Sequence, residues 1–89
     1  MIKAVLIKVS GRLKQVGYHS NMVIAAQELH IAGTYTSNPD GSVSMTAQGE
    51  EKDLHDFIEY SKKPSPFTRV DSHNVEAIEV NEELTSFEG

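Results

Sequence analysis

The order in which the hydrophobic pattern changes its period restricts the fold of this chain more than any other feature. Residues 2–9 alternate between two faces, with Val5 and Ile7 on one of them, as in a β-strand. A loop with two glycines follows. A helix is then predicted to begin near His19 or Ser20, because the next apolar residues recur every three or four positions.

The rest of the chain repeats this order after a tight turn. Residues 34–48 are predicted to form a β-hairpin around the turn residues 39–42, where Pro and Gly supply the backbone angles that a turn needs. A second helix is predicted over 50–62, and Pro64 ends it. A last strand is predicted over 69–80, and the change of apolar phase within it indicates a β-bulge.

The order strand, helix, strand, strand, helix, strand is that of the ferredoxin-like α+β fold (βαββαβ), in which two helices cover one face of an antiparallel sheet. The length of 89 residues suits a single domain over 1–89. Residues 81–89 are acidic, and we expect them to be loose apart from Phe87. Because this fold hosts many unrelated functions, function must be inferred from a site.

Composition excludes several classes of function. The chain has no cysteine, so it has no disulfide, no thiolate zinc site and no cysteine nucleophile, and we expect a cytoplasmic location. The net charge of −5 argues against nucleic-acid binding, and no apolar run is long enough to span a membrane. Four histidines without a tight spacing predict no metal site, and we expect a monomer.

The charge is distributed unevenly along the chain. The charged residues before Glu28 are all basic, whereas the six charged residues from Asp71 onward are all acidic. A small anion is therefore best received at the glycine loop that leads into the first helix, where free backbone N–H groups and the helix dipole point outward. The alternative is that this segment only connects the strand to the helix.

Two segments carry a family resemblance. Residues 9–19 (VSGRLKQVGYH) resemble the acylphosphatase motif V-x-G-R-V-Q-G-V-G-F-R. Residues 33–43 (GTYTSNPDGSV) resemble its second motif, G-W-V-R-N-x-P-D-G-S-V. The similarity continues in order to about Phe87, where the last strand of the family is cut short or absent.

The resemblance implies hydrolysis of an acyl phosphate, the mixed anhydride of a carboxylate and phosphate, without a metal or cofactor. It implies that a phosphate-like anion or acyl phosphate is held by backbone N–H groups and by the arginine that ends the first motif, and that an asparagine positions the attacking water. The anion-binding residues implied here are Gln15, Val16, Gly17, Tyr18 and His19, with Arg12 as a nearby cation.

The two catalytic positions depart from the family pattern. His19 stands at the arginine position and Ser37 at the asparagine position. Gln15 stands where the family motif has the first glycine of its Q-G-V-G segment. Arginine offers a fixed, charged fork to two phosphate oxygens, whereas imidazole offers one N–H to one oxygen and is charged only when protonated. The sequence therefore predicts an inactive or very weak acylphosphatase-like protein that still binds a small anion.

Two alternatives remain open. The first is a genuine acylphosphatase in which His19 binds the phosphate and Ser37 the water, with a rate that rises as the pH falls. The second is a protein-interaction module that uses the sheet face or a free sheet edge. Asn38 is a poor substitute for the missing asparagine, because a shift of one residue along a strand reverses the direction of the side chain. Asn38 is therefore interpreted as a turn residue.

Overall fold

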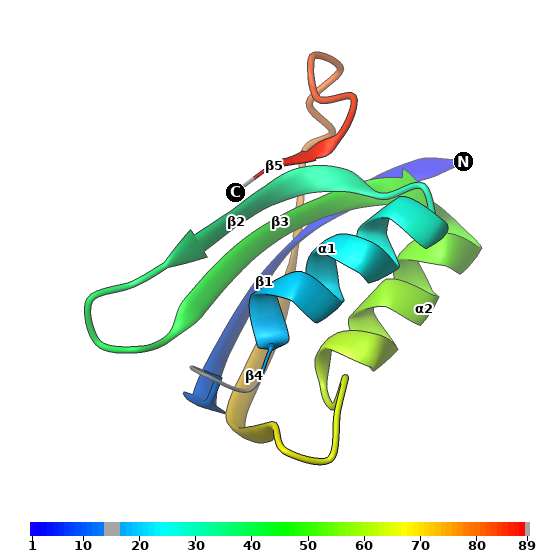
Figure 1. Cartoon of the computed structure of the whole chain (residues 1–89). Coiled ribbons are helices and arrows are strands. Elements are labelled where there is room, and N and C mark those ends of the chain that lie inside the picture. The colour runs from blue at the N-terminus through cyan, green and yellow to red at the C-terminus, as the bar shows by residue number, and fades with distance from the viewer. Residues whose placement is uncertain (14–16, 89) are drawn as a thin grey trace.

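The computed structural model describes residues 1–13 and 17–88. Within these residues, two helices and a five-stranded sheet follow the predicted order (Figure 1). The strands are β1 (Ile2–Arg12), β2 (Ala32–Ser37), β3 (Val43–Glu50), β4 (Arg69–Ile78) and β5 (Phe87–Glu88). The helices are α1 (Tyr18–Glu28) and α2 (Glu51–Ser61).

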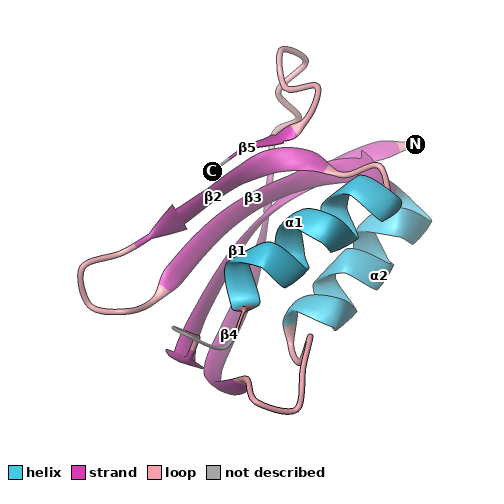
Figure 2. Cartoon of the chain, viewed as in Figure 1, coloured by secondary structure: helices cyan, strands magenta, loops and turns pink. Residues whose placement is uncertain are grey.

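The sheet has the strand order β4-β1-β3-β2-β5. Its pairings are antiparallel except that of β2 with the two-residue strand β5, which is parallel. Both helices lie on the same face of the sheet (Figure 2). The prediction of a ferredoxin-like α+β fold is confirmed, and the last described strand has two residues.

The predicted bulge lies at the start of β4. Ser10 of β1 faces Ser72, but the next residue, Gly11, faces Val70, so Asp71 is the extra residue on β4. Because β1 and β4 pair on both sides of this bulge, β1 extends to Arg12, three residues beyond its predicted end. The first strand is therefore long enough to reach the loop that leads into α1.

The hydrophobic core lies between the sheet and the two helices. Ile7 of β1, Met45 of β3, Met22 of α1 and Phe57 of α2 are fully buried there. Tyr18, the first residue of α1, is also buried, and its hydroxyl donates a 2.8 Å hydrogen bond to the carbonyl oxygen of Ser61. The core thus fixes the point at which α1 begins, one residue before the predicted start.

The segment between β4 and β5 passes from one edge of the sheet to the other. Gln48 of β3 holds it with two hydrogen bonds: its Nε2 donates to the carbonyl oxygen of Asn81 (2.7 Å), and its Oε1 accepts from the N–H of Asn81 (2.9 Å). At the far edge, Phe87 pairs with Gly33 of β2 and packs against the core. The sequence predicts a loose acidic segment over 81–89, whereas its described part contacts the sheet at these two places.

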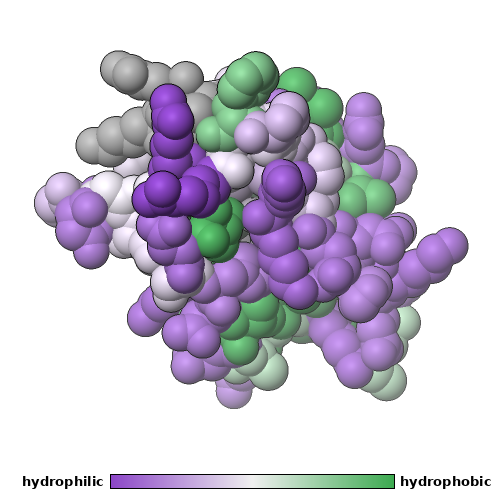
Figure 3. All heavy atoms as spheres, turned by 90° about the horizontal axis from the view of Figure 1, so that it is seen from below, coloured by the Kyte–Doolittle hydropathy of each residue, from purple (hydrophilic) through white to green (hydrophobic). Residues whose placement is uncertain are grey.

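One face of the molecule is predominantly polar. In the view from below, hydrophilic residues cover most of the face, with a few hydrophobic residues between them (Figure 3). In the described residues, no helix is both long and apolar enough to cross a membrane. Among the described residues, the large apolar side chain with the greatest exposure after Met1 is Phe67, at 73 %.

Candidate functional site

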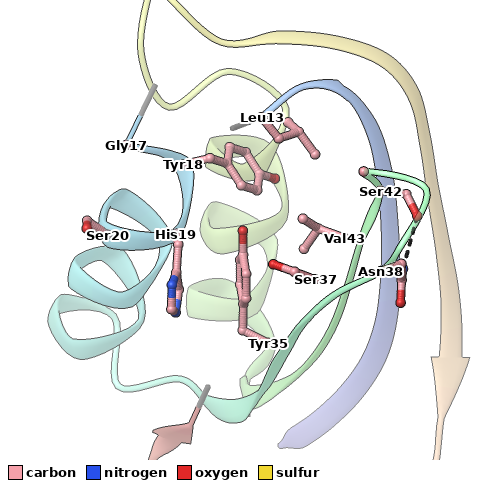
Figure 4. Close-up of a pocket in the computed structure, with 11 residues that line it drawn as sticks. Leu13, Gly17, Tyr18, His19, Ser20, Tyr35, Ser37, Asn38, Ser42 and Val43 are labelled. Atoms are coloured by element: carbon pink, nitrogen blue, oxygen red, sulfur yellow. Dashed lines mark hydrogen bonds between the residues drawn. The ribbon is translucent and has the colours of Figure 1, made fainter. Parts of the chain in front are cut away.

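A hollow of about 250 Å³ lies where the start of α1 meets the end of β2 and the following turn (Figure 4). It brings together segments that are far apart in the sequence, namely the end of the first motif, the end of β2 and part of the hairpin turn. Its lining residues are Leu13, Gly17, Tyr18, His19, Ser20, Tyr35, Ser37, Asn38, Gly41, Ser42 and Val43.

The first turn of α1 borders this hollow. Gly17 precedes the helix with φ 76° and ψ 18°, in the left-handed region that glycine adopts without strain. Among the described residues, no side chain caps this end of the helix, and the first turn contains no acidic residue. No described side chain therefore competes with an anion for its backbone N–H groups and the positive end of the helix dipole. Gln15 and Val16, also predicted to bind the anion, lie outside the described residues.

His19 is exposed and lies in the first turn of α1, beside the hollow. Its imidazole stacks on the phenol ring of Tyr35 from β2, with 4.2 Å between the ring centroids and 19° between the ring planes (Figure 4). A neutral imidazole in this place can donate one hydrogen bond to an anion, and a protonated one adds a positive charge.

Ser37 is the last residue of β2 and is also exposed. Side chains two apart on a strand share a face, so Ser37 and Tyr35 both line the hollow. Burial raises the pKa of Tyr35, and a hydrogen bond with Ser37 opposes part of that rise. Tyr35 therefore presents a neutral phenol at neutral pH, and the structure brings His19, Tyr35 and Ser37 to one site.

Comparison with known proteins agrees with this architecture. The sequence profile described as Acylphosphatase matches residues 5–89. A protein named Acylphosphatase from Lactobacillus johnsonii is 41% identical over 87 residues, which cover 97% of this chain and 96% of the relative. This chain belongs to the acylphosphatase family.

Further members of the acylphosphatase family extend the match. A protein named Acylphosphatase from Oceanobacillus iheyensis is 35% identical over 88 residues, covering 98% of this chain and 97% of that protein. The crystal structure of acylphosphatase from Bacillus subtilis superposes with a TM-score of 0.89 at 31% identity, covering 99% of this chain and 97% of that chain. The family resemblance and the fold predicted from the sequence are both confirmed.

Asn38 and Arg12 also belong to the two motifs, but their places in the structure differ from those of His19 and Ser37. Asn38 lines the hollow, but its Nδ2 donates to the hydroxyls of Ser42 (3.0 Å) and Ser44 (3.1 Å), which confirms its interpretation as a turn residue. Arg12, predicted to lie near the anion, is the exposed last residue of β1, faces Arg69 of β4 and does not line the hollow.

The other reactive side chains of the described residues do not form a second site. Within residues 1–13 and 17–88, no cluster of three metal-ligating side chains could hold an ion. His73 Nε2 lies 2.9 Å from the hydroxyl of Ser61, but Ser61 is fully buried and donates to the carbonyl oxygen of Ile58 (2.6 Å). A substrate has no access to that hydroxyl, so this pair holds α2 against β4.

Sequence reasoning missed Tyr35. The sequence places residue 35 in the predicted hairpin, where the motifs direct attention to Ser37 and Asn38 alone. The period of two along a strand was the available signal, since it places residue 35 on the same face as residue 37. That signal does not reveal the contact with His19, which is 16 positions away in the sequence and meets Tyr35 only in the folded chain.

Proposed function

We propose that this acylphosphatase-family protein binds a small phosphate-type anion at the start of α1 and hydrolyses acyl phosphates weakly or not at all. The observation that carries the proposal is that His19 and Ser37, which we align with the arginine and asparagine of the motifs, line the same hollow beside a helix N-terminus that no described side chain caps. The start of α1 thus offers backbone N–H groups to an anion, while the two side chains of the motifs are changed.

The expected loss of hydrolysis rate follows from electrostatics. Hydrolysis of an acyl phosphate by water yields a carboxylate and inorganic phosphate, and negative charge must be stabilised on the phosphate oxygens as the anhydride breaks. Removing one donor aimed at developing charge typically costs ~10²–10³ in rate. His19 keeps one donor but lacks the two-pronged contact of a guanidinium, and the hydroxyl of Ser37 is shorter than an amide.

The proposal includes a monomer that works without a metal or cofactor. The absence of cysteine is in keeping with a cytoplasmic location, where disulfides are rare. The substrate class is the acyl phosphates on which the family acts, with inorganic phosphate as the product and as a simple probe of the site.

Hydrolysis of benzoyl phosphate tests the proposal. The wild type, His19→Arg/Ser37→Asn and the control His55→Arg are compared, since His55 is an exposed histidine of α2 away from the hollow. We expect the double variant to gain at least ~100-fold in kcat/KM and the control to match the wild type. A wild type already as fast as the double variant would overturn the proposal.

The second candidate is a genuine acylphosphatase that uses His19 and Ser37 themselves. The observation in its favour is that both side chains lie at one hollow in a chain whose relatives carry the name Acylphosphatase. It predicts substantial wild-type hydrolysis that rises as the pH falls, because imidazolium is the better phosphate ligand, and that disappears in His19→Ala. Slow hydrolysis without this pH dependence would reject it.

A further inference from the structure

We propose that Tyr35 is the positioning residue of the anion site, because its ring holds the imidazole of His19 in one orientation beside the start of α1. The inference rests on the proposed function and adds to it. Tyr35 itself was not among the residues that the sequence motifs single out. In the second motif, this position is valine.

The contact has the geometry of a stacked pair. The ring centroids of His19 and Tyr35 are 4.2 Å apart and the ring planes differ by 19°. Figure 4 shows the two rings side by side, one from α1 and the other from β2, with the hydroxyl of Tyr35 on the side of Tyr18 and Ser37. One face of the His19 ring is thus covered by a side chain from another element.

Tyr35 is itself held in place by the sheet and the core. Its backbone pairs with Met45 of β3, a fully buried residue. Its ring also packs against that of Tyr18, with centroids 6.5 Å apart, and Tyr18 is anchored by its bond to Ser61. Tyr35 therefore behaves as part of the rigid framework, and an otherwise exposed histidine is fixed against it.

A fixed donor binds an anion more tightly than a mobile one. Immobilising a free side chain on binding costs conformational entropy, and a donor already held in position avoids much of that cost. Stacking on Tyr35 restricts the orientation of the His19 ring, as a two-pronged contact with phosphate would restrict that of a guanidinium. The energy of an aromatic pair corresponds to a change of roughly 2- to 12-fold in affinity. We expect the phosphate affinity to fall within this range when the stack is lost.

The test measures binding of inorganic phosphate by NMR titration in Tyr35→Val, Tyr35→Phe, His19→Ala and the double variant His19→Ala/Tyr35→Val. Valine is accepted on a β-strand and is the residue of the family motif, so the variant is expected to fold. The ring-current shift of the His19 side-chain protons reports the stack independently of phosphate. Thr36→Val, an exposed neighbour on the opposite strand face, is the matched control.

We expect Tyr35→Val to lose the ring-current shift and to weaken phosphate binding roughly 2- to 12-fold. Tyr35→Phe should recover both, since the ring remains. Because Tyr35 acts through His19, Tyr35→Val should add nothing in the His19→Ala background. Thr36→Val should match the wild type.

Three results overturn the inference. In the first, phosphate affinity is unchanged in Tyr35→Val although the stack is lost, and the proposed function then stands without a role for Tyr35. In the second, Tyr35→Phe is as weak as Tyr35→Val, so the hydroxyl touches the anion directly. In the third, the wild type fails to bind phosphate, and the proposed function then falls together with this inference.

Discussion

The hydroxyl of Tyr18 donates a 2.8 Å hydrogen bond to the carbonyl oxygen of Ser61, which joins the first residue of α1 to the last residue of α2. Tyr18 is fully buried, and burial raises the pKa of its hydroxyl well above the usual range, so the group stays protonated and can donate. The site at the start of α1 is therefore tied to the core through one buried bond.

Removing this bond is expected to destabilise the protein without removing the ring that fills the core. Tyr18→Phe should lower the free energy of unfolding by about 1–2 kcal/mol, because the Ser61 carbonyl then loses a buried donor. Chemical denaturation measures the change. Tyr60→Phe, at a partly exposed position on α2, is the control and should change stability little. Equal effects of the two variants would contradict this account.

His73 should make stability depend on pH. Burial, with a smaller contribution from the Lys62 ammonium, lowers the pKa of His73 below the usual 6.5, although Glu59 acts in the opposite direction. Between those two pKa values the unfolded chain binds more protons than the folded protein, so stability is full above pH 6.5 and falls as the pH drops toward the lower, folded value.

The matched variants for this effect are His73→Gln and, as an exposed control on α2, His55→Gln. Denaturation of each protein at several values from about pH 8 to about pH 5 gives the dependence. We expect His73→Gln to lose less stability on acidification than the wild type, while His55→Gln follows the wild type. An unchanged slope in His73→Gln would show that this residue does not control the transition.

Substitutions at two glycines, Gly33 and Gly41, distinguish the cost of steric overlap from the cost of backbone strain. A Cβ at Gly33 would overlap the backbone carbonyl oxygen of Thr46 on the paired strand, whereas a Cβ at Gly41 would meet nothing within 4 Å. Gly41 has φ 90°, so its replacement brings strain alone. We expect Gly33→Ala to cost about 3 kcal/mol or more and Gly41→Ala about 1–2 kcal/mol in unfolding free energy. Thermal unfolding of the two variants tests this order.

Anion binding at the proposed site should depend on His19 far more than on Arg12. His19→Ala removes the side chain that lines the hollow, and we expect phosphate affinity to fall by about 10-fold, as for the loss of one charge-assisted bond. Arg12→Ala removes a cation that lies outside the lining, so its effect should be smaller and should vanish at high salt. Calorimetric titration with phosphate at two salt concentrations distinguishes these two roles.

Local patterns in the sequence were sufficient to predict the order of helices and strands. Alternation over 2–9, the turn at 39–42 and Pro64 act on neighbouring residues, so each can be interpreted without knowing the fold. The bulge in the last long strand was predicted for the same reason, from a change of apolar phase, and it lies at Asp71. Family membership followed from two motifs at fixed spacing and was confirmed.

The candidate site was predictable only in part. The motifs pointed to His19 and Ser37, and both line the hollow, because each is placed by the end of an element that the sequence defines. Gln48 holding Asn81, Tyr18 reaching Ser61 and Tyr35 stacking on His19 were not predictable, since these partners are 33, 43 and 16 positions apart. No local pattern encodes such contacts.

The sequence by itself determined which segments become helices and strands, and which family the chain resembles, because propensity, periodicity and motif spacing are properties of neighbouring residues. Only the tertiary structure decided which side chains share the hollow and which partner each one has. The packing of α1 on the sheet brings His19 to Tyr35. The distance between two side chains on different elements is fixed by that packing and not by their separation along the chain.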